Sequence, residues 1–152
     1  MAPRYWTYAS IPMTELHHRI KVFVYRLQHG KPHYLLLRKA LGLNPTWGVL
    51  DGEIGFHEQI ETAIHREVCD DIGLPAERGP IDLAMPKRWV IGEEEVIEWP
   101  YGFQTPGPRK ELVLDQRWSD YCWAEFGDAY ARFQLELDRA AITRLHTIIL
   151  AA

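Results

Sequence analysis

Residues 52–74, GEIGFHEQIETAIHREVCDDIGL, decide the fold and place six acidic side chains within 23 residues. From Glu58 to Ile72, apolar residues recur at the spacing of one helix face, and Gly73 follows where such a helix would end. This pattern predicts a helix over residues 58–72 that packs one face on a sheet.

One face of the predicted helix is apolar in its first half and acidic in its second half. With about 100° per residue and Glu67 set at zero, Ile60, Ala63, Ile64 and Asp71 fall within about 60° of it, and Asp70 lies about 60° away at the edge of this face. Two carboxylates about 4 Å apart repel by roughly 4 kcal/mol at an effective dielectric of about 20. A Mg²⁺ ion would relieve this repulsion, because hard cations prefer oxygen ligands. The alternative is a solvated helix face on which Arg66 pairs with Asp70.

The spacing of the defined residues is specific. Gly52 is followed after five residues by Glu58, after seven more by Arg66-Glu67, and then by Val68, Asp70-Asp71, Gly73 and Leu74. This resembles the signature box of the Nudix hydrolase superfamily, if Asp is accepted for the two Glu of the second acidic pair. The resemblance implies an α/β/α sandwich, a mixed sheet flanked by helices, with a loop-helix-loop metal site. It also implies hydrolysis of a nucleoside diphosphate linked to another group.

Carried over by position, the resemblance assigns roles to the box residues. Glu67, Asp70 and Asp71 correspond to the metal ligands, with the carbonyl of Gly52 as an additional one, for Mg²⁺ or alternatively Mn²⁺. Glu58 corresponds to the acid that supports the site. Arg66 corresponds to the cation that pairs with a box acid and fixes the loop.

An acid outside the box often supplies the general base in this superfamily. The candidates are Glu93, Glu94, Glu95 and Glu98. We favour Glu98, because EWPYGFQTP resembles the strand of the pteridine and deoxynucleotide triphosphate pyrophosphatases of the family, and we place Glu95 second. The alternative is that all four belong to a solvated loop and strand edge.

Basic and aromatic residues outside the box are candidates for substrate contact. Arg38 and Lys39 close a predicted strand before the box loop and could bind phosphate, although terminal basic residues are often only solvated. Trp47 and Tyr101 are candidate base contacts, as are Phe56 and Trp99. Core packing is the alternative for these aromatic residues.

The sequence departs from the family pattern at three places. Asp70 and Asp71 are one methylene shorter than Glu, and Mg²⁺ demands near-octahedral geometry. Leu50-Asp51-Gly52 replaces the usual Pro-Gly-Gly, and His57 replaces a frequent glycine. These changes keep open a second function class, a catalytically silent nucleotide-binding module.

The rest of the chain reads as one domain over residues 1–152, with 1–17 an N-terminal extension or edge segment. A hairpin is predicted from RIKVFVYRL and HYLLLRK. Further strands are predicted from IDLAMPKRWVI, EEVIEWPYGFQ, KELVL and SDYCWAEF. Residues 126–150 have helical patterning with a break near Gln134.

The charge and the apolar content of the chain disfavour some classes of binding partner. The net charge of −4 gives no general attraction to nucleic acid or anionic membrane, which disfavours RNA without excluding it. No continuous apolar run suits a signal or a membrane span, so we expect a cytoplasmic protein. The resemblance implies a small nucleotide-like substrate, and a monomer and a homodimer both stay open. Nucleoside or pterin triphosphates are favoured. The alternatives are diadenosine polyphosphates and RNA 5′ ends.

Overall fold

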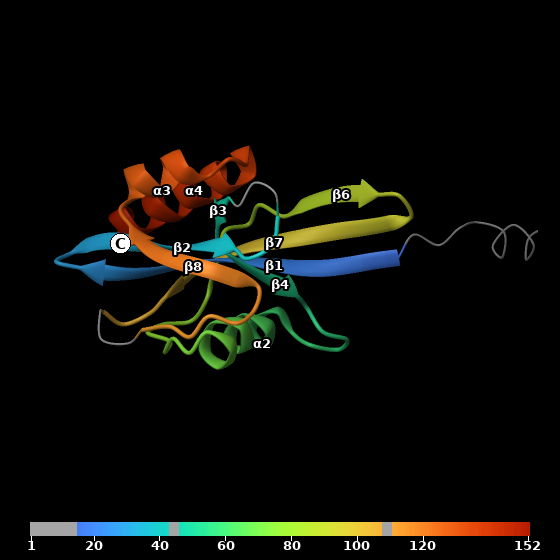
Figure 1. Ribbon diagram of the computed structural model, residues 1–152. Helices are drawn as coiled ribbons and strands as arrows, with labels where there is room; N and C mark the ends of the chain where they lie inside the picture. Colours follow the sequence, from blue (N-terminus) through green and yellow to red (C-terminus); the bar gives the residue numbers. More distant parts are fainter. Residues whose placement is uncertain (1–14, 43–45, 108–110) are drawn as a thin grey trace, which may run out of the picture.

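The computed structural model describes residues 15–42, 46–107 and 111–152. In this part of the chain, eight strands form one mixed sheet with helices on both faces (Figure 1). The predicted α/β/α sandwich is therefore confirmed. The segment 1–17, expected to be an extension or edge segment, lies mostly outside the described residues, and the first strand already begins at Glu15.

The predicted hairpin is confirmed. Strands β1 (Glu15–Gln28) and β2 (Lys31–Lys39) pair antiparallel, and the turn between them places His29 and Gly30 at positive φ, 52° and 76°. On its other edge β2 pairs with β8 (Trp118–Ala124), while the short β3 (Trp47–Gly48) pairs with the end of β2 on the same edge as β1.

Strand β1 is the centre of the sheet. It pairs parallel with β7 (Glu94–Gln104) and antiparallel with both β2 and β4 (Leu50–Glu53). Strands β5 (Ile81–Asp82) and β6 (Lys87–Ile91) pair antiparallel with β7. The box glycine Gly52 therefore lies on β4, directly beside the central strand.

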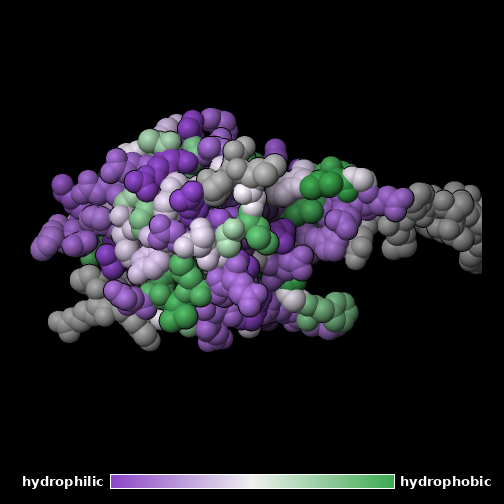
Figure 2. Space-filling view, viewed as in Figure 1, coloured by the Kyte–Doolittle hydropathy of each residue, from purple (hydrophilic) through white to green (hydrophobic). Residues whose placement is uncertain are grey.

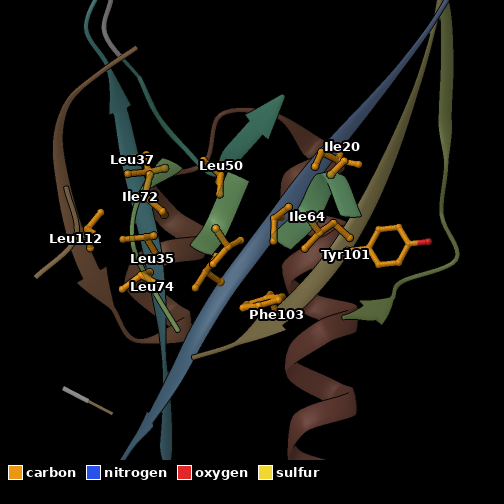
Figure 3. Packing of buried hydrophobic residues seen from close by; sticks show 14 of the residues in the cluster. Ile20, Leu35, Leu37, Leu50, Ile64, Ile72, Leu74, Tyr101, Phe103 and Leu112 are labelled. Atoms are coloured by element: carbon orange, nitrogen blue, oxygen red, sulfur yellow. The ribbon is translucent and has the colours of Figure 1, made fainter. Parts of the chain in front are cut away.

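One face of the sheet is covered by the box helix. It consists of α2 (Ile60–His65) and a π-helical continuation, η1 (Arg66–Asp71). Ala63, Ile64 and Val68 are fully buried there, against Ile20 and neighbouring even-numbered residues of β1 (Figure 3). The predicted helix is thus confirmed, with its last six residues in the wider π form. Gly73 follows at φ +77°, which suits glycine at a helix end.

The opposite face is covered by α3 (Phe126–Arg132) and α4 (Glu136–Ala151), which confirms the predicted break near Gln134. Phe23 and Tyr25 of β1 point into this layer and pack with Phe133, Ile142 and Leu145. In the described part of the chain, no helix is long and apolar enough to cross a membrane.

One predicted strand is wrong. Residues 111–114 of KELVL form no strand, although Leu112 is buried in the box-helix layer and the amide of Val113 donates to the carbonyl of Ile72. The segment therefore covers the end of η1 as an extended loop. Hydrophilic side chains dominate the face in Figure 2, and a hydrophobic group lies over the end of β6, where Val90 and Ile91 are exposed.

Candidate functional site

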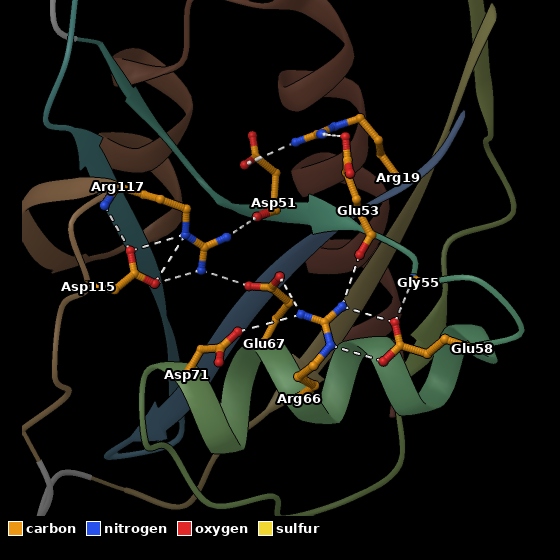
Figure 4. Close-up of polar contacts among 10 residues, drawn as sticks. All are labelled: Arg19, Asp51, Glu53, Gly55, Glu58, Arg66, Glu67, Asp71, Asp115 and Arg117. Atoms are coloured by element: carbon orange, nitrogen blue, oxygen red, sulfur yellow. Dashed lines mark hydrogen bonds and ion pairs between the residues drawn. The ribbon is translucent and has the colours of Figure 1, made fainter. Parts of the chain in front are cut away.

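The box loop is held by a two-pronged ion pair between Glu58 and Arg66 (Figure 4). Arg66 donates from Nε to Glu58 Oε2 at 2.9 Å and from Nη2 to Glu58 Oε1 at 3.0 Å, and Nη2 also reaches the carbonyl of Glu53 at 2.9 Å. The amide of Gly55 donates to Glu58 Oε1 at 2.8 Å. These hydrogen bonds hold the pKa of Glu58 below its ordinary value, and the bonds from Arg66 have the larger effect. The structure thus brings Glu58 and Arg66 together at the box loop, and their supporting roles stay predictions.

Glu67 is the buried carboxylate of the site, with only 3% of its surface exposed. Its Oε1 accepts from Arg66 Nη1 at 3.0 Å, and its Oε2 accepts from Arg117 Nη2 at 2.8 Å. It also lies directly against the backbone of Gly52, where a Cβ would come within 2.2 Å of Oε1. Gly52 is therefore required here for close approach.

Arg117 is a member of this cluster that the sequence analysis missed. It lies just before β8 and makes a two-pronged pair with Asp115, with Nε 3.1 Å from both carboxylate oxygens and Nη2 2.8 Å from Oδ2. Its Nη1 donates to the carbonyl of Asp51 at 3.0 Å. Hydrogen bonding to Asp115 has the largest effect in raising the pKa of Arg117, and the bond to Glu67 raises it further. In turn Arg117 lowers the pKa of Asp115. Its distance from the box along the chain left no local spacing to reveal it.

The second acidic pair of the box is more exposed. Asp71 Oδ2 lies 3.6 Å from Arg66 Nη1, with 37% of its side chain exposed. Asp70 is exposed beside Cys69, whose pKa is raised by burial first and by the charge of Asp70 second. The structure therefore brings Glu67 and Asp71 to one arginine but turns Asp70 outward.

The oxygen donors are of the kind that Mg²⁺ prefers. They do not surround one point, however: among the described residues, no three His, Cys, Asp or Glu side chains are placed to hold a metal ion. Both oxygens of Glu67 are instead bound to guanidinium groups. The oxygen atoms are thus chemically suited to binding a hard cation, but in this structure arginine side chains occupy the two oxygens of Glu67.

An outer ring of ion pairs surrounds this centre. Arg19 lies 3.7 Å from Asp51 and 3.4 Å from Glu53, and Lys39 lies 3.6 Å from Asp51. The joined groups are six carboxylates and four cations, which leaves two negative charges in excess: Asp51, Glu53, Glu58, Glu67, Asp71 and Asp115 against Arg19, Lys39, Arg66 and Arg117. This excess favours a further cation at the site.

Glu98 lies in the other layer of the molecule. On β7, a Cβ at Gly102 would meet Leu145 of α4, so the even-numbered side chains from Glu98 onward face α4. Glu98 lies 3.7 Å from Lys21 Nζ, which in turn donates to Asp138 at 2.6 Å. Burial raises the pKa of Glu98, and the charge of Lys21 partly opposes this. The structure does not bring Glu98 together with Glu67, which approaches from the box-helix layer.

The other candidate bases are on the β6–β7 ribbon. Glu95 pairs with Arg88 at 3.0 Å, and Glu94 lies 3.9 Å from His17. Glu93 is exposed in the turn between the two strands. These contacts hold Glu94 and Glu95 at the ribbon, away from the box.

Two hollows adjoin the site. One, of about 190 Å³, lies on the α4 side, and Lys39 rather than Arg38 contributes to its wall, together with Lys21, Trp47, Asp51, Trp118 and Asp138. A larger groove of about 830 Å³ lies along the box loop, whose residues 53–61 form most of its wall, together with Leu16, His18 and Trp99. Tyr101, a predicted base contact, is only 7% exposed and belongs to the core.

No family model matches this sequence, and no curated protein matches it. Solved structures do. An Ap4A hydrolase from C. elegans has a TM-score of 0.75 at 14% identity, covering 90% of this chain and 99% of its own. The E. coli dihydroneopterin triphosphate pyrophosphohydrolase has a TM-score of 0.68 at 20% identity, covering 89% and 96%. RenU, a Nudix hydrolase from M. smegmatis, has a TM-score of 0.68 at 20% identity, covering 89% and 86%. These similarities show that the chain has the Nudix hydrolase fold.

Proposed function

We propose that this chain is a Nudix-type pyrophosphohydrolase that cleaves a diphosphate linkage in a small nucleotide-like substrate. One observation carries the proposal: within the Nudix fold, Glu67 is buried directly against Gly52, at the junction of β4 and the box helix. The Glu58–Arg66 pair fixes the loop between them. The residues of the box thus occupy one connected structure as well as one stretch of sequence.

A divalent ion, Mg²⁺ or Mn²⁺, belongs to this proposal. Glu67, Asp71 and the carbonyl of Gly52 would hold it, joined by Asp70 once its side chain, which is exposed in this structure, turns toward them. When bound, such an ion neutralises the diphosphate and lowers the pKa of an attacking water. The two excess negative charges of the ion-pair cluster support this assignment.

The cavity of about 190 Å³ is the proposed substrate side. Lys39 at its wall would meet phosphate oxygens, and Arg38, its neighbour on β2, would add positive charge. The ring of Trp47 would stack on the base or pterin. It is already contacted from one side by Arg132, whose guanidinium carbon lies 5.4 Å from the ring centroid.

Glu98 stays the proposed general base. Its raised pKa suits a group that must take up a proton near neutral pH. It faces the same side of the sheet as the cavity, because its neighbours Lys21 and Asp138 line both that cavity and a smaller one that Glu98 itself lines. In this role it would act from the substrate side rather than through Glu67.

The favoured substrates are nucleoside or pterin triphosphates. The neighbour that is a dihydroneopterin triphosphate pyrophosphohydrolase supports this class, whereas the neighbour that is an Ap4A hydrolase supports a diadenosine polyphosphate. Diadenosine polyphosphates and RNA 5′ ends are the alternatives. The cytoplasmic location and the oligomeric state stay predictions.

A substrate panel tests the proposal. Purified protein with Mg²⁺ or Mn²⁺ is given each candidate substrate, and released phosphate and pyrophosphate are measured separately. We expect pyrophosphate from a nucleoside or pterin triphosphate. Release of phosphate alone, or of nucleoside monophosphates from a diadenosine polyphosphate, would reassign the substrate.

A catalytically silent nucleotide-binding module is the second candidate. The observation that favours it is the pairing of both Glu67 oxygens with arginines, which occupies the acid of the box. Saturable nucleotide binding with no hydrolysis of any substrate in the panel, in either metal, would establish it.

A further inference from the structure

Arg117 occupies the side of Glu67 that a metal ion would need. Its Nη2 lies 2.8 Å from Glu67 Oε2, and its remaining donors bind Asp115 and the carbonyl of Asp51. One guanidinium therefore joins the buried box acid, the backbone beside Gly52 and the loop before β8 (Figure 4).

Arg117 and a divalent ion would both draw on Glu67 Oε2. A carboxylate oxygen has two lone-pair sites, but a guanidinium bound at one of them opposes a divalent ion at the other, because two cations this close repel each other. We propose that Arg117 is an internal cation that competes with the divalent ion for Glu67, so that metal binds only when Arg117 is displaced. This inference rests on the proposed function, because it assumes that Glu67 is a metal ligand.

Arg117 is the arginine that can leave. Arg66 is fixed by its two-pronged pair with Glu58 and by the carbonyl of Glu53, and it lies on the box helix itself. Arg117 instead lies in a loop, two residues from Asp115, and its two-pronged contact with Asp115 can persist without Glu67. Displacement therefore breaks one ion pair and leaves the guanidinium neutralised.

The arrangement also explains how Glu67 is buried without a metal. A buried, unpaired carboxylate is costly, and Arg117 supplies a second positive partner beside Arg66. The site is thus stable before metal binds, at the cost of a weaker metal affinity.

The test is Mn²⁺ binding to the full chain, followed by the EPR signal of free Mn²⁺ and by calorimetry, without substrate. We expect Arg117→Gln to bind Mn²⁺ roughly tenfold tighter or more than the wild type, because a competing charge is removed. Arg117→Lys keeps the charge but loses the planar fork, so its affinity should fall between the two. Adding Glu67→Gln to Arg117→Gln should abolish the gain.

Arg139→Gln is the matched control. Arg139 also joins a carbonyl, that of Phe133, to a carboxylate, that of Glu136, but it does so on α4. Its substitution should leave Mn²⁺ affinity unchanged. Thermal melting of each variant checks the fold, and Arg117→Lys preserves the test if Arg117→Gln does not fold.

Equal or weaker Mn²⁺ affinity in a folded Arg117→Gln or Arg117→Lys variant would overturn the inference. An equal gain in Arg139→Gln would also do so. Failure of the proposed function looks different: Arg117→Gln binds Mn²⁺ tightly through Glu67, yet neither it nor the wild type hydrolyses any substrate in the panel.

Discussion

Substitution of Gly52 by alanine should disturb the centre of the site without replacing any charged residue. The added Cβ would lie 2.2 Å from Glu67 Oε1 and 2.7 Å from its Cδ. To reach even a 3.0 Å contact, Oε1 must retreat by about 0.8 Å. The carboxylate cannot retreat freely, because Arg66 and Arg117 hold its two oxygens.

The magnitude follows from these contacts. Two hydrogen bonds between charged groups are each worth about 1.5–3 kcal/mol. The two arginine side chains are 36% and 38% exposed, so solvent screening reduces each to about 1 kcal/mol. Replacing glycine by alanine also restricts the unfolded chain, which returns about 0.4–1 kcal/mol. We expect a net loss of about 1–2 kcal/mol in the free energy of unfolding, and a drop in melting temperature of about 2–8 °C.

Urea unfolding followed by tryptophan fluorescence measures the loss. Gly48→Ala is the control, because a Cβ at Gly48 meets nothing within 4 Å and neither glycine has positive φ. It should be neutral or slightly stabilising. If Gly52→Ala were as stable as Gly48→Ala, the close approach of Glu67 to this backbone would be refuted.

Three further predictions concern carboxylates. Glu67→Gln should lower turnover by orders of magnitude while the chain still folds, since both arginines keep other acidic partners; near wild-type hydrolysis would remove Glu67 from the site. Glu58→Gln should cost about 1 kcal/mol of unfolding free energy at pH 7. Because the pKa of Glu58 is lowered in the folded state, Glu58 adds to the free energy of unfolding above the ordinary glutamate pKa, and this addition is lost as pH falls through the lowered pKa. Urea unfolding should therefore show the stabilities of the wild type and Glu58→Gln converging in acid. Glu98→Gln should lower turnover and remove the acidic limb of its pH profile, and an unchanged profile would move the base to another residue. The raised pKa of Glu98 favours the folded state below the ordinary glutamate pKa and loses this effect as pH rises through the raised value, so the wild type should lose stability relative to Glu98→Gln on going from acid to neutral pH.

The sequence predicted the parts of the fold that local spacing determines. The hairpin around Gly30, the box helix and the two C-terminal helices follow from alternation, helical periodicity and a terminal glycine. The strand expected at KELVL fails because a short apolar run does not distinguish a paired strand from an extended segment over a hydrophobic layer. Leu112 is buried in either case.

The site was predicted only in part, for a physical reason. The box fixes Gly52, Glu58, Arg66 and Glu67 locally, and the structure brings these four together. A helical projection of about 100° per residue is valid only for an α-helix, and from Arg66 onward the chain is a π-helix, which turns less per residue. The projection therefore misplaces Asp70.

Tertiary structure decides the remaining contacts. Arg117 approaches Glu67 from 50 residues away, and that pairing depends on where the loop before β8 crosses the sheet. The layer that Glu98 faces depends on the register of β7 against β1. Neither is encoded in the spacing of nearby residues.

The parallel pairing of β1 with β7 has a consequence for how the chain acquires its structure. Glu15 lies opposite Glu94 and Tyr25 opposite Gln104, so the central ladder joins segments that are 79 residues apart. The chain must lose the entropy of closing this long loop before the pairing of β1 with β7 can stabilise it, and such topologies fold slowly. During synthesis, β1 keeps one edge unpaired at least until the start of β7 at Glu94 has left the ribosome, and an unpaired strand edge exposes the nascent chain to aggregation.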